Sequence, residues 1–401
     1  MEFKRKLASV MHVEEILPIP NADKLELARM DGWKAVVQKG KFSVGDRVVY
    51  IETDSLLPPW DEFSFMAERK YRVKQIRLRG QLSDGLVFHF DDIQTKNIPF
   101  RMRDAGTDLT ELLEIKHYQK EAEAAKTGKN PQIKKKGLRG WMYGKAVKAI
   151  ETLIGPINGM GPWPGYCPKS DEPTLRHVWG VVKNNYLGLP VVCHEKMHGK
   201  SLTLYYYEGK IGVCSRNYEL LTDTSRQVSP LRRKGATMLA KLLGIRINNY
   251  DQEDYWVFAD RIKDSVVAYC ELTGQNLAIQ LELCGPKING NMYQFPDYRG
   301  FVFDVWDIDE RRYFNTDEVD MLCSRAGLER VPELKQIQLH DDLEQYFVDA
   351  TGNSLVATSI REGMVVRPLH TEIHDPAMGR FSFKVVSPDY KAREDKLLGL
   401  E

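Results

Sequence analysis

The chain has 401 residues, of which 42% are hydrophobic and 28% are charged, and its 57 basic and 56 acidic residues give a net charge of +1. A chain of this length is too long for one average hydrophobic core, so two or three domains are expected. The balanced charge excludes a protein that binds nucleic acid through overall basicity, and any polyanion must be bound by local patches.

Cysteine usage and apolar runs indicate a protein of the cell interior. The six cysteines are scattered, with no CxxC pair and no Cys/His ligand spacing, which argues against a zinc site and a disulfide framework. The first ten residues lack the apolar stretch of a signal peptide, and no apolar run is long enough to span a bilayer. We therefore expect a soluble cytoplasmic protein with no membrane partner.

Residues 1–110 are dominated by short strand-like runs. Turn residues at Gly40 and at Gly45 and Asp46 interrupt the apolar alternation, as in closely spaced β-strands. This pattern favours a small β-barrel. The basic residues near its end, such as Arg77 and Arg79, fit either a solvated strand face or a face that binds nucleic acid.

The next segment, residues 111–165, is predicted to be a basic insertion or linker. Between residues 116 and 148, ten Lys or Arg stand against two Glu, a local excess of eight positive charges. A helix-prone piece, Glu121–Lys126, is broken by TGKNP, and INGMGPWPGYCP further on is rich in Gly and Pro, as linkers are. The segment is either a solvated connector or a phosphate-binding arm with KKKGLRG as its core.

Residues 166–401 combine many strand-like runs with few helices, which predicts an α+β domain with largely antiparallel sheets. The strand-like runs are YLGLPVVCHEK, SLTLYYYEGKIGVCSRN, LAIQLELCG, FVFDVWDI, EGMVVRPL and FSFKVVS. Helices are predicted near 230–243, 253–273 and 316–326, the last opened by a capping residue, Asn315 or Thr316.

Polar side chains recur at the ends of these strands. They are Lys196, Arg216, Glu282, Asp304, Glu362 and Lys384. No GxxxxGK[ST] loop, GxGxxG turn, HExxH or GxSxG motif accompanies them, so phosphate would not be bound in the P-loop or Rossmann manner. Any one of these residues alone is more often an ordinary solvent-exposed side chain than part of a site. Their shared placement predicts a common site.

Several motifs resemble one family of enzymes. EKMHG resembles the KxDG nucleotidyltransferase motif of covalent ligases, in the KxHG form typical of RNA ligases related to the phage nick-sealing enzyme. SRN, LELCGPKINGN, FVFDVW, EGMVVRP and SFKVVS follow in the family's order, and CPKSDEPTLRHVW is similar to its PKTDE lead-in. The N-terminal PNADKL and VGDRVVYIETDSLLP resemble OB-type domains. The closest family is the bacterial type exemplified by the Deinococcus RNA ligase, an OB-type barrel followed by an adenylyltransferase domain.

The resemblance implies a nucleophilic lysine at Lys196. A neutral amine would attack the α-phosphate of ATP, expel pyrophosphate and leave lysyl-AMP. Because the ordinary lysine pKa is near 10.4, the amine needs surroundings that favour its neutral form. Burial and a nearby cation such as Lys384 are expected to lower the pKa of Lys196.

The other site residues are also implied by the resemblance. Gly199 would allow a close backbone approach after the nucleophile, and His198 would support later steps. The nucleotide would contact Glu195, Arg216 (ribose or phosphates), Glu282 (ribose hydroxyl), Phe303 (stacking on adenine) and Lys384 (α-phosphate). Glu362 would help to bind the metal, Mg²⁺ or Mn²⁺.

One position departs from the family pattern. Relatives often carry a KxK pair, but here Ser382 stands two residues before Lys384, so one cation remains where two are usual. With one cation in place of two, a smaller lowering of the Lys196 pKa is expected from that side. Lys287 could compensate, although a surface turn is the more natural place for it.

The sequence therefore predicts an ATP-dependent RNA ligase that joins RNA with 5′-phosphate and 3′-hydroxyl ends in a nicked duplex. Two alternatives stay open. A DNA ligase or capping-type nucleotidyltransferase would share the lysine chemistry, but these enzymes typically carry KxDG and an OB domain that follows the catalytic domain. A non-enzymatic OB-fold RNA-binding protein would not need Lys196, Arg216 and Glu282 together.

Overall fold

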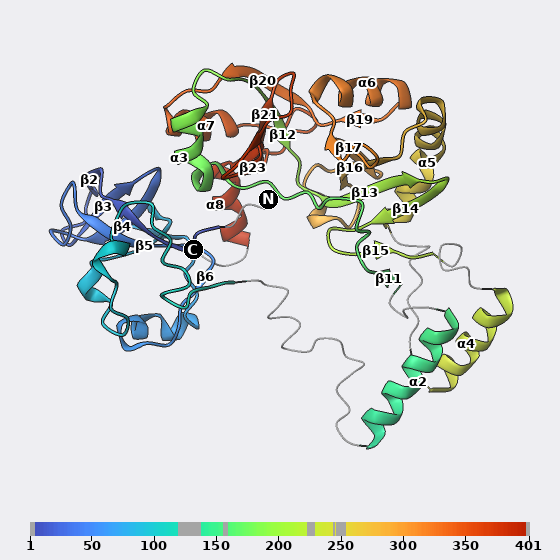
Figure 1. Ribbon diagram of the computed structural model, residues 1–401, viewed down its shortest axis with the longest axis horizontal. Coiled ribbons are helices and arrows are strands. Elements are labelled where there is room, and N and C mark those ends of the chain that lie inside the picture. The colour runs from blue at the N-terminus through green and yellow to red at the C-terminus, as the bar shows by residue number, and fades with distance from the viewer. Residues whose placement is uncertain are drawn as a thin grey trace. The chain divides into compact units, whose positions relative to one another are not determined.

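A computed structural model describes residues 5–118, 138–154, 159–222, 229–243, 245 and 254–397. The chain forms two compact units that interleave in sequence (Figure 1). The first unit comprises residues 1–127, 175–185 and 394–401, and the second comprises residues 128–174 and 186–393. The predicted α+β class with largely antiparallel sheets is confirmed.

The first unit is built from short antiparallel strands. One sheet has the order β1-β5-β9, a second is the meander β2-β3-β4, and two strand pairs are β10-β6 and β7-β8. Their bounds are β1 Ala8–His12, β2 Glu15–Pro18, β3 Leu25–Met30, β4 Trp33–Gln38, β5 Arg47–Glu52, β6 Ser55–Leu56, β7 Ile76–Leu78, β8 Gln81–Ser83, β9 Gly85–Phe88 and β10 Lys116–His117. The β3–β4 hairpin turns at Asp31 and Gly32, both with positive φ, as a two-residue hairpin turn requires.

Helix α3, Leu175–Asn185, packs in this first unit although it lies beyond residue 165 in sequence. It is amphipathic and buries Leu175, Val178, Trp179 and Val182. Arg176 Nη1 lies 2.5 Å from Asp84 Oδ2, which comes just before β9. Three 3₁₀ segments complete the unit, Asp61–Arg69, Phe90–Asp92 and Phe100–Met102.

Two sheets make up the second unit. The larger has the order β11-β15-β14-β13-β16-β17-β18, with β19 paired in parallel to β17, and the smaller has the order β20-β12-β21-β24. Their bounds are β11 Met160–Gly161, β12 Pro190–Lys196, β13 Lys200–Tyr207, β14 Lys210–Cys214, β15 Glu219–Leu220, β16 Leu277–Cys284, β17 Arg299–Asp307, β18 Arg312–Tyr313, β19 Glu329–Arg330, β20 Glu333–Gln338, β21 Gly363–Pro368 and β24 Phe383–Val386. A separate short pair is β22 His374–Asp375 with β23 Gly379–Arg380.

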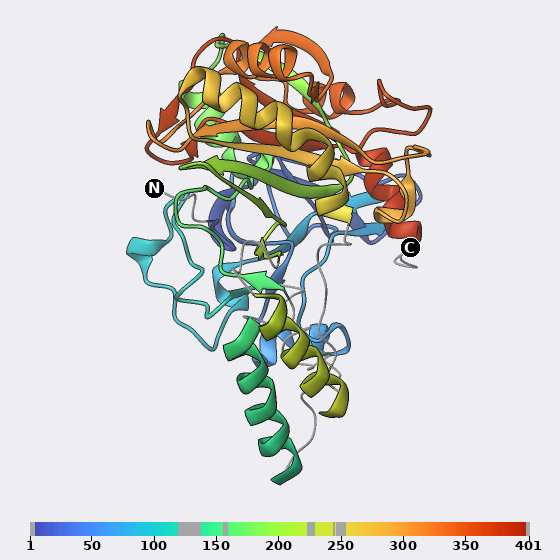
Figure 2. The ribbon, with the colours of Figure 1, turned by 90° about the vertical axis from the view of Figure 1, so that its right-hand side faces the viewer.

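The helices of the second unit follow the predicted ranges closely. Helices α5, Asp254–Thr273, and α6, Thr316–Ala326, cover one face of the larger sheet (Figure 2), and their apolar side chains form a core with β13, β16 and β17. Asn315 is the N-cap of α6, because its side chain accepts a hydrogen bond from the backbone N–H of Glu318. Helices α7, Leu343–Ala350, and α8, Pro388–Leu397, come before β21 and after β24.

A separate pair of helices stands where the basic segment ends. Helix α2, Leu138–Ile154, lies beside α4, Pro230–Leu243, and a small core including Ile150, Ala236 and Ala240 joins them. The predicted helix-prone piece at 121–126 and most of the KKKGLRG stretch lie outside the described residues. Within the described part of the chain, no helix is both long and apolar enough to cross a membrane.

Candidate active site

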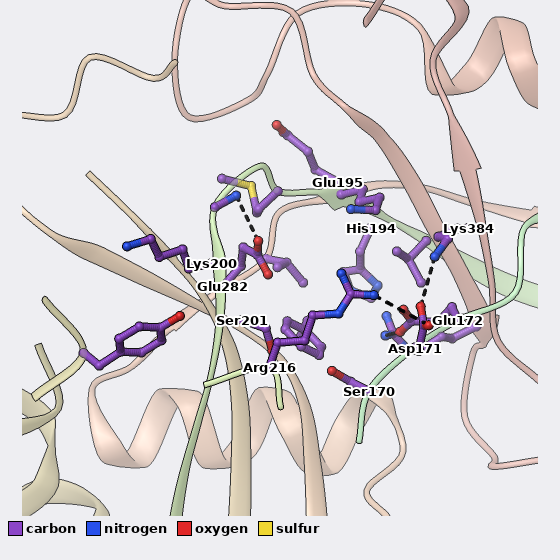
Figure 3. A pocket seen from close by; sticks show the side chains of 18 residues that line it. Ser170, Asp171, Glu172, His194, Glu195, Lys200, Ser201, Arg216, Glu282 and Lys384 are labelled. Atoms are coloured by element: carbon purple, nitrogen blue, oxygen red, sulfur yellow. Dashed lines mark hydrogen bonds and ion pairs between the residues drawn. The ribbon is translucent and has the colours of Figure 1, made fainter. Parts of the chain in front are cut away.

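A cavity of about 330 Å³ opens between the two sheets of the second unit (Figure 3). Its lining includes seven of the residues predicted for the nucleotide site, namely Glu195, Lys196, Gly199, Arg216, Glu282, Phe303 and Lys384. Strand β12 enters from the smaller sheet, and β13, β16 and β17 contribute from the larger one. Positions almost 190 residues apart in sequence thus line one cavity.

Lys196, the last residue of β12, is ion-paired with Glu362. Its Nζ lies 2.7 Å from Glu362 Oε1, and β12 pairs with β21 so that Lys196 is opposite Gly363. Burial lowers the pKa of Lys196, but the carboxylates of Glu362 and Glu282 outweigh burial, so the pKa of Lys196 is raised. The expectation of a lowered pKa is therefore wrong for the nucleotide-free protein, because the nearest charges are negative.

Glu282 supports the turn that follows the nucleophile. Its Oε1 accepts a 2.9 Å hydrogen bond from the backbone N–H of Gly199. A Cβ on Gly199 would lie 2.3 Å from the carbonyl oxygen of Leu283, so only glycine permits this approach to β16. Burial, and to a lesser extent the charge of Glu362, raises the pKa of Glu282 to about 7 despite the opposing charge of Lys196.

The raised pKa of Glu282 predicts a dependence of stability on pH. Its contribution to stability is fully present below the ordinary value of 4.5 and is lost as the pH rises through about 7. We expect Glu282→Gln, which does not titrate, to gain about 2 kcal/mol in unfolding free energy relative to the wild type between pH 5 and pH 8. Chemical denaturation at both pH values measures this difference, and a difference that is independent of pH would contradict the prediction.

His198 is held between two tyrosines that sequence reasoning missed. The backbone N–H of His198 donates to Tyr293 Oη at 2.7 Å, and its Nδ1 lies 2.8 Å from Tyr390 Oη on α8. The same Nδ1 is 3.6 Å from Glu362 Oε2. Tyr293 lies just after the GPKING stretch, but nothing in the sequence pattern of α8 marks Tyr390.

The two predicted phosphate-binding cations share a carboxylate. Lys384 Nζ lies 3.2 Å from Asp171 Oδ1, and Arg216 Nη2 lies 3.7 Å from Asp171 Oδ2 (Figure 3). The cation that was expected to lower the pKa of Lys196 is thus paired with Asp171. Asp171 and Glu172 both line the cavity and both belong to the PKSDE lead-in.

Four other residues discussed in the sequence analysis differ in whether their side chains face the cavity. The Glu195 side chain points away from the cavity, and its Oε2 accepts a hydrogen bond from the backbone N–H of Leu355 (Figure 3). Phe303 lies in the cavity lining, from β17. Ser382 is buried. Lys287 is exposed in a turn, has a positive φ and lies outside the cavity lining, which agrees with the surface turn expected for it.

Of the six strand-end residues, Asp304 and Glu362 are outside the cavity lining, and Asp304 belongs to a buried cluster of its own. It is 2% exposed, and its Oδ2 lies 3.0 Å from Arg367 Nη2 and 2.9 Å from Arg380 Nη1. Burial raises the pKa of Asp304, but the two arginines prevail and lower it. Asp304 therefore holds β17 to β21 and to the short strand β23, and Arg367 reaches from this cluster to the cavity wall.

The carboxylates suit a nucleotide-bound divalent cation. Among the described residues, no cluster of three or more His, Cys, Asp or Glu side chains could hold a metal by itself. Glu362 Oε1 lies 2.7 Å from the Lys196 amine, and Glu282 lines the same cavity as Lys196. Mg²⁺ binds through one or two carboxylates together with substrate phosphates, so this donor set fits it.

Comparisons with known proteins agree with this geometry. Residues 189–386 match the family model described as RNA ligase, and residues 7–90 match the model described as PHA02142 OB-fold domain. No curated protein matches the chain. The solved Naegleria gruberi RNA ligase with PPi is 26% identical with a TM-score of 0.68, and the alignment covers 98% of this chain and all of that one. A glutamate variant of that ligase with ATP and Mn is 26% identical with a TM-score of 0.69, over 97% of this chain and 99% of that one.

The family matches, together with a cavity lined by a lysine and carboxylates, define the class of protein as a nucleotidyltransferase with an RNA ligase domain. The likeness to solved RNA ligases extends over nearly the whole chain and is not confined to the catalytic domain. The chain therefore carries an RNA ligase domain, and the comparisons support the prediction of an ATP-dependent RNA ligase. This result disfavours the DNA ligase, capping and purely RNA-binding alternatives.

Proposed function

We propose that the chain joins 5′-phosphate and 3′-hydroxyl ends of RNA through a covalent adenylate on Lys196. The observation that carries this proposal is the position of the Lys196 amine, which shares one cavity with Arg216, Glu282 and Lys384 and pairs with Glu362 at 2.7 Å. In the first step the Lys196 nitrogen bonds to the α-phosphorus of ATP, and the bond from that phosphorus to the pyrophosphate oxygen breaks.

The lysine proton must leave before this bond forms. In the nucleotide-free site Glu362 and Glu282 raise the pKa of Lys196, so the amine is kept as an ammonium. A divalent cation bound with ATP would neutralise these carboxylates and lower the pKa of the amine. Lys384 and Arg216 would bind phosphate oxygens and stabilise the charge that develops on them.

The later steps use the same residues. AMP passes from Lys196 to the RNA 5′-phosphate, and the 3′-hydroxyl oxygen then bonds to that phosphorus and releases AMP. The motif EKMHG at the end of β12 and the N-terminal position of the OB-fold domain support a KxHG enzyme of the Deinococcus type acting on nicked duplex. Such a nick would be recognised through phosphate contacts and A-form shape.

We also propose a domain organisation and a location. Residues 1–110 form the OB-fold domain, 111–165 the basic insertion, and 166–401 the nucleotidyltransferase domain. The family matches at 7–90 and 189–386 fall inside the first and last of these ranges.

A cytoplasmic location is supported by the six cysteines, all of which are free thiols in buried positions.

The proposal is tested with α-labelled ATP and GTP in the presence of Mg²⁺. We expect label from ATP to survive denaturation and to be located on the peptide that carries Lys196 by mass spectrometry. Label from GTP alone would favour a capping-type enzyme, and absence of label would overturn the proposal. Sealing of nicks with RNA or DNA on the 3′-hydroxyl side then identifies the substrate.

A further inference from the structure

A carboxylate of the chain stands between two cations of the nucleotide cavity. Asp171 lies 3.2 Å from the Lys384 amine and 3.7 Å from the Arg216 guanidinium (Figure 3). Lys384 comes from β24 of the smaller sheet, and Arg216 follows β14 of the larger sheet. One side chain thus bridges two cations that belong to different sheets.

The backbone on both sides of Asp171 is fixed. The carbonyl oxygen of Pro168 accepts a 2.8 Å hydrogen bond from Gln280 Nε2, and that of Pro173 accepts a 2.8 Å bond from the Lys384 backbone N–H. The neighbouring Glu172 is paired with Arg367 at 2.7 Å. The Asp171 side chain itself is 65% exposed, so it can turn towards solvent while this segment stays in place.

We propose that Asp171 occupies the position of a nucleotide phosphate and competes with it. This inference rests on the proposed function, in which Arg216 and Lys384 bind phosphate. A carboxylate and a phosphate offer the same oxygen acceptors to a lysine and an arginine. When ATP binds, its phosphate oxygens replace the two Asp171 oxygens and the carboxylate moves into solvent.

The contacts of Asp171 are weak enough to be exchanged. Ion pairs between exposed side chains contribute little, because water screens them and both side chains lose freedom. The Arg216 side chain is 68% exposed and that of Lys384 is 24% exposed. A nucleotide phosphate carries more charge than a carboxylate and therefore displaces Asp171, but at a reduced affinity.

The proposal predicts tighter nucleotide binding when the carboxylate is removed. We expect Asp171→Asn to bind α,β-methylene-ATP about threefold to tenfold more tightly than the wild type, as the loss of two exposed ion pairs implies. Adenosine has no phosphate, so its affinity should not change. Asp171→Glu keeps the carboxylate and should bind the analogue nearly as the wild type does. Isothermal titration calorimetry with Mg²⁺ measures all of these affinities.

The control is Asp297→Asn, which removes an exposed carboxylate paired with Arg261 outside the cavity lining. This variant should bind both ligands as the wild type does. Weaker binding of the analogue to Asp171→Asn would mean that Asp171 contacts the nucleotide or its metal, and unchanged binding would mean that it does not compete; either result overturns the proposal. If the wild type binds neither ligand and takes no label, the proposed function fails instead.

Discussion

Lys196→Met is expected to abolish the covalent adenylate and to destabilise the second unit. The variant retains most of the side-chain volume but has no nucleophile, so we expect labelling to fall by at least about 10⁴-fold. It also leaves Glu362 and Glu282 without their shared cation. Removal of one partner of a buried ion pair leaves an uncompensated charge, which destabilises the fold. Because Lys196 is partly exposed, the loss is smaller than for a fully buried pair, and we expect about 2 kcal/mol in unfolding free energy at pH 8.

A second variant separates the two effects of this substitution. Lys196→Met combined with Glu362→Gln removes both charges of the 2.7 Å pair and should regain most of the lost stability while taking no label. Denaturation and labelling with α-labelled ATP are measured on the same preparations. Label on either variant would show that another residue is the nucleophile, and a double variant as unstable as the single one would show that charge is not the cause.

The sequence predicted that residues at strand ends would share a site, and four of those six residues line one cavity. Lys196 ends β12 and Lys384 lies on β24, and both strands pair with β21 in the smaller sheet. Glu282 lies near the end of β16 in the larger sheet, and all three residues line one cavity. Periodicity and capping likewise predicted α6 and its N-cap, Asn315. These features are local in sequence, and local patterns determine them.

The charges around the site could not be predicted in the same way. The pKa of Lys196 depends on which charged groups lie nearest its amine, and the distance to Glu362 is set by pairing between strands that are far apart in sequence. In the sequence, Asp171 is only one residue of a motif. In the structure, the backbone hydrogen bond between Lys384 and Pro173 brings the segment of Asp171 beside β24, where Asp171 pairs with Lys384. The packing of α3 in the first unit also depends on contacts with residues that are distant in sequence.

Asp304→Asn is expected to destabilise the second unit by about 3 to 5 kcal/mol, because it leaves two arginines in a buried site without their shared carboxylate. The substitution retains the shape of the side chain and removes only the charge. Arg367 keeps Glu172 as a partner and Arg380 keeps Glu372, but neither of these pairs replaces the contacts of Asp304 at 2.9 and 3.0 Å. Chemical denaturation followed by tryptophan fluorescence measures the loss.

Asp260→Asn is the matched control, since it removes an exposed carboxylate that is paired with the exposed Lys263 at 2.7 Å. An exposed pair contributes about 0 to 1 kcal/mol, so this variant should be nearly as stable as the wild type. Asp304→Asn combined with Arg380→Gln removes one of the two arginine charges that lose their contact with Asp304 and should regain part of the stability. If Asp304→Asn is no less stable than Asp260→Asn, water must reach the cluster, and the cavity wall at Arg367 is then not held by buried charge.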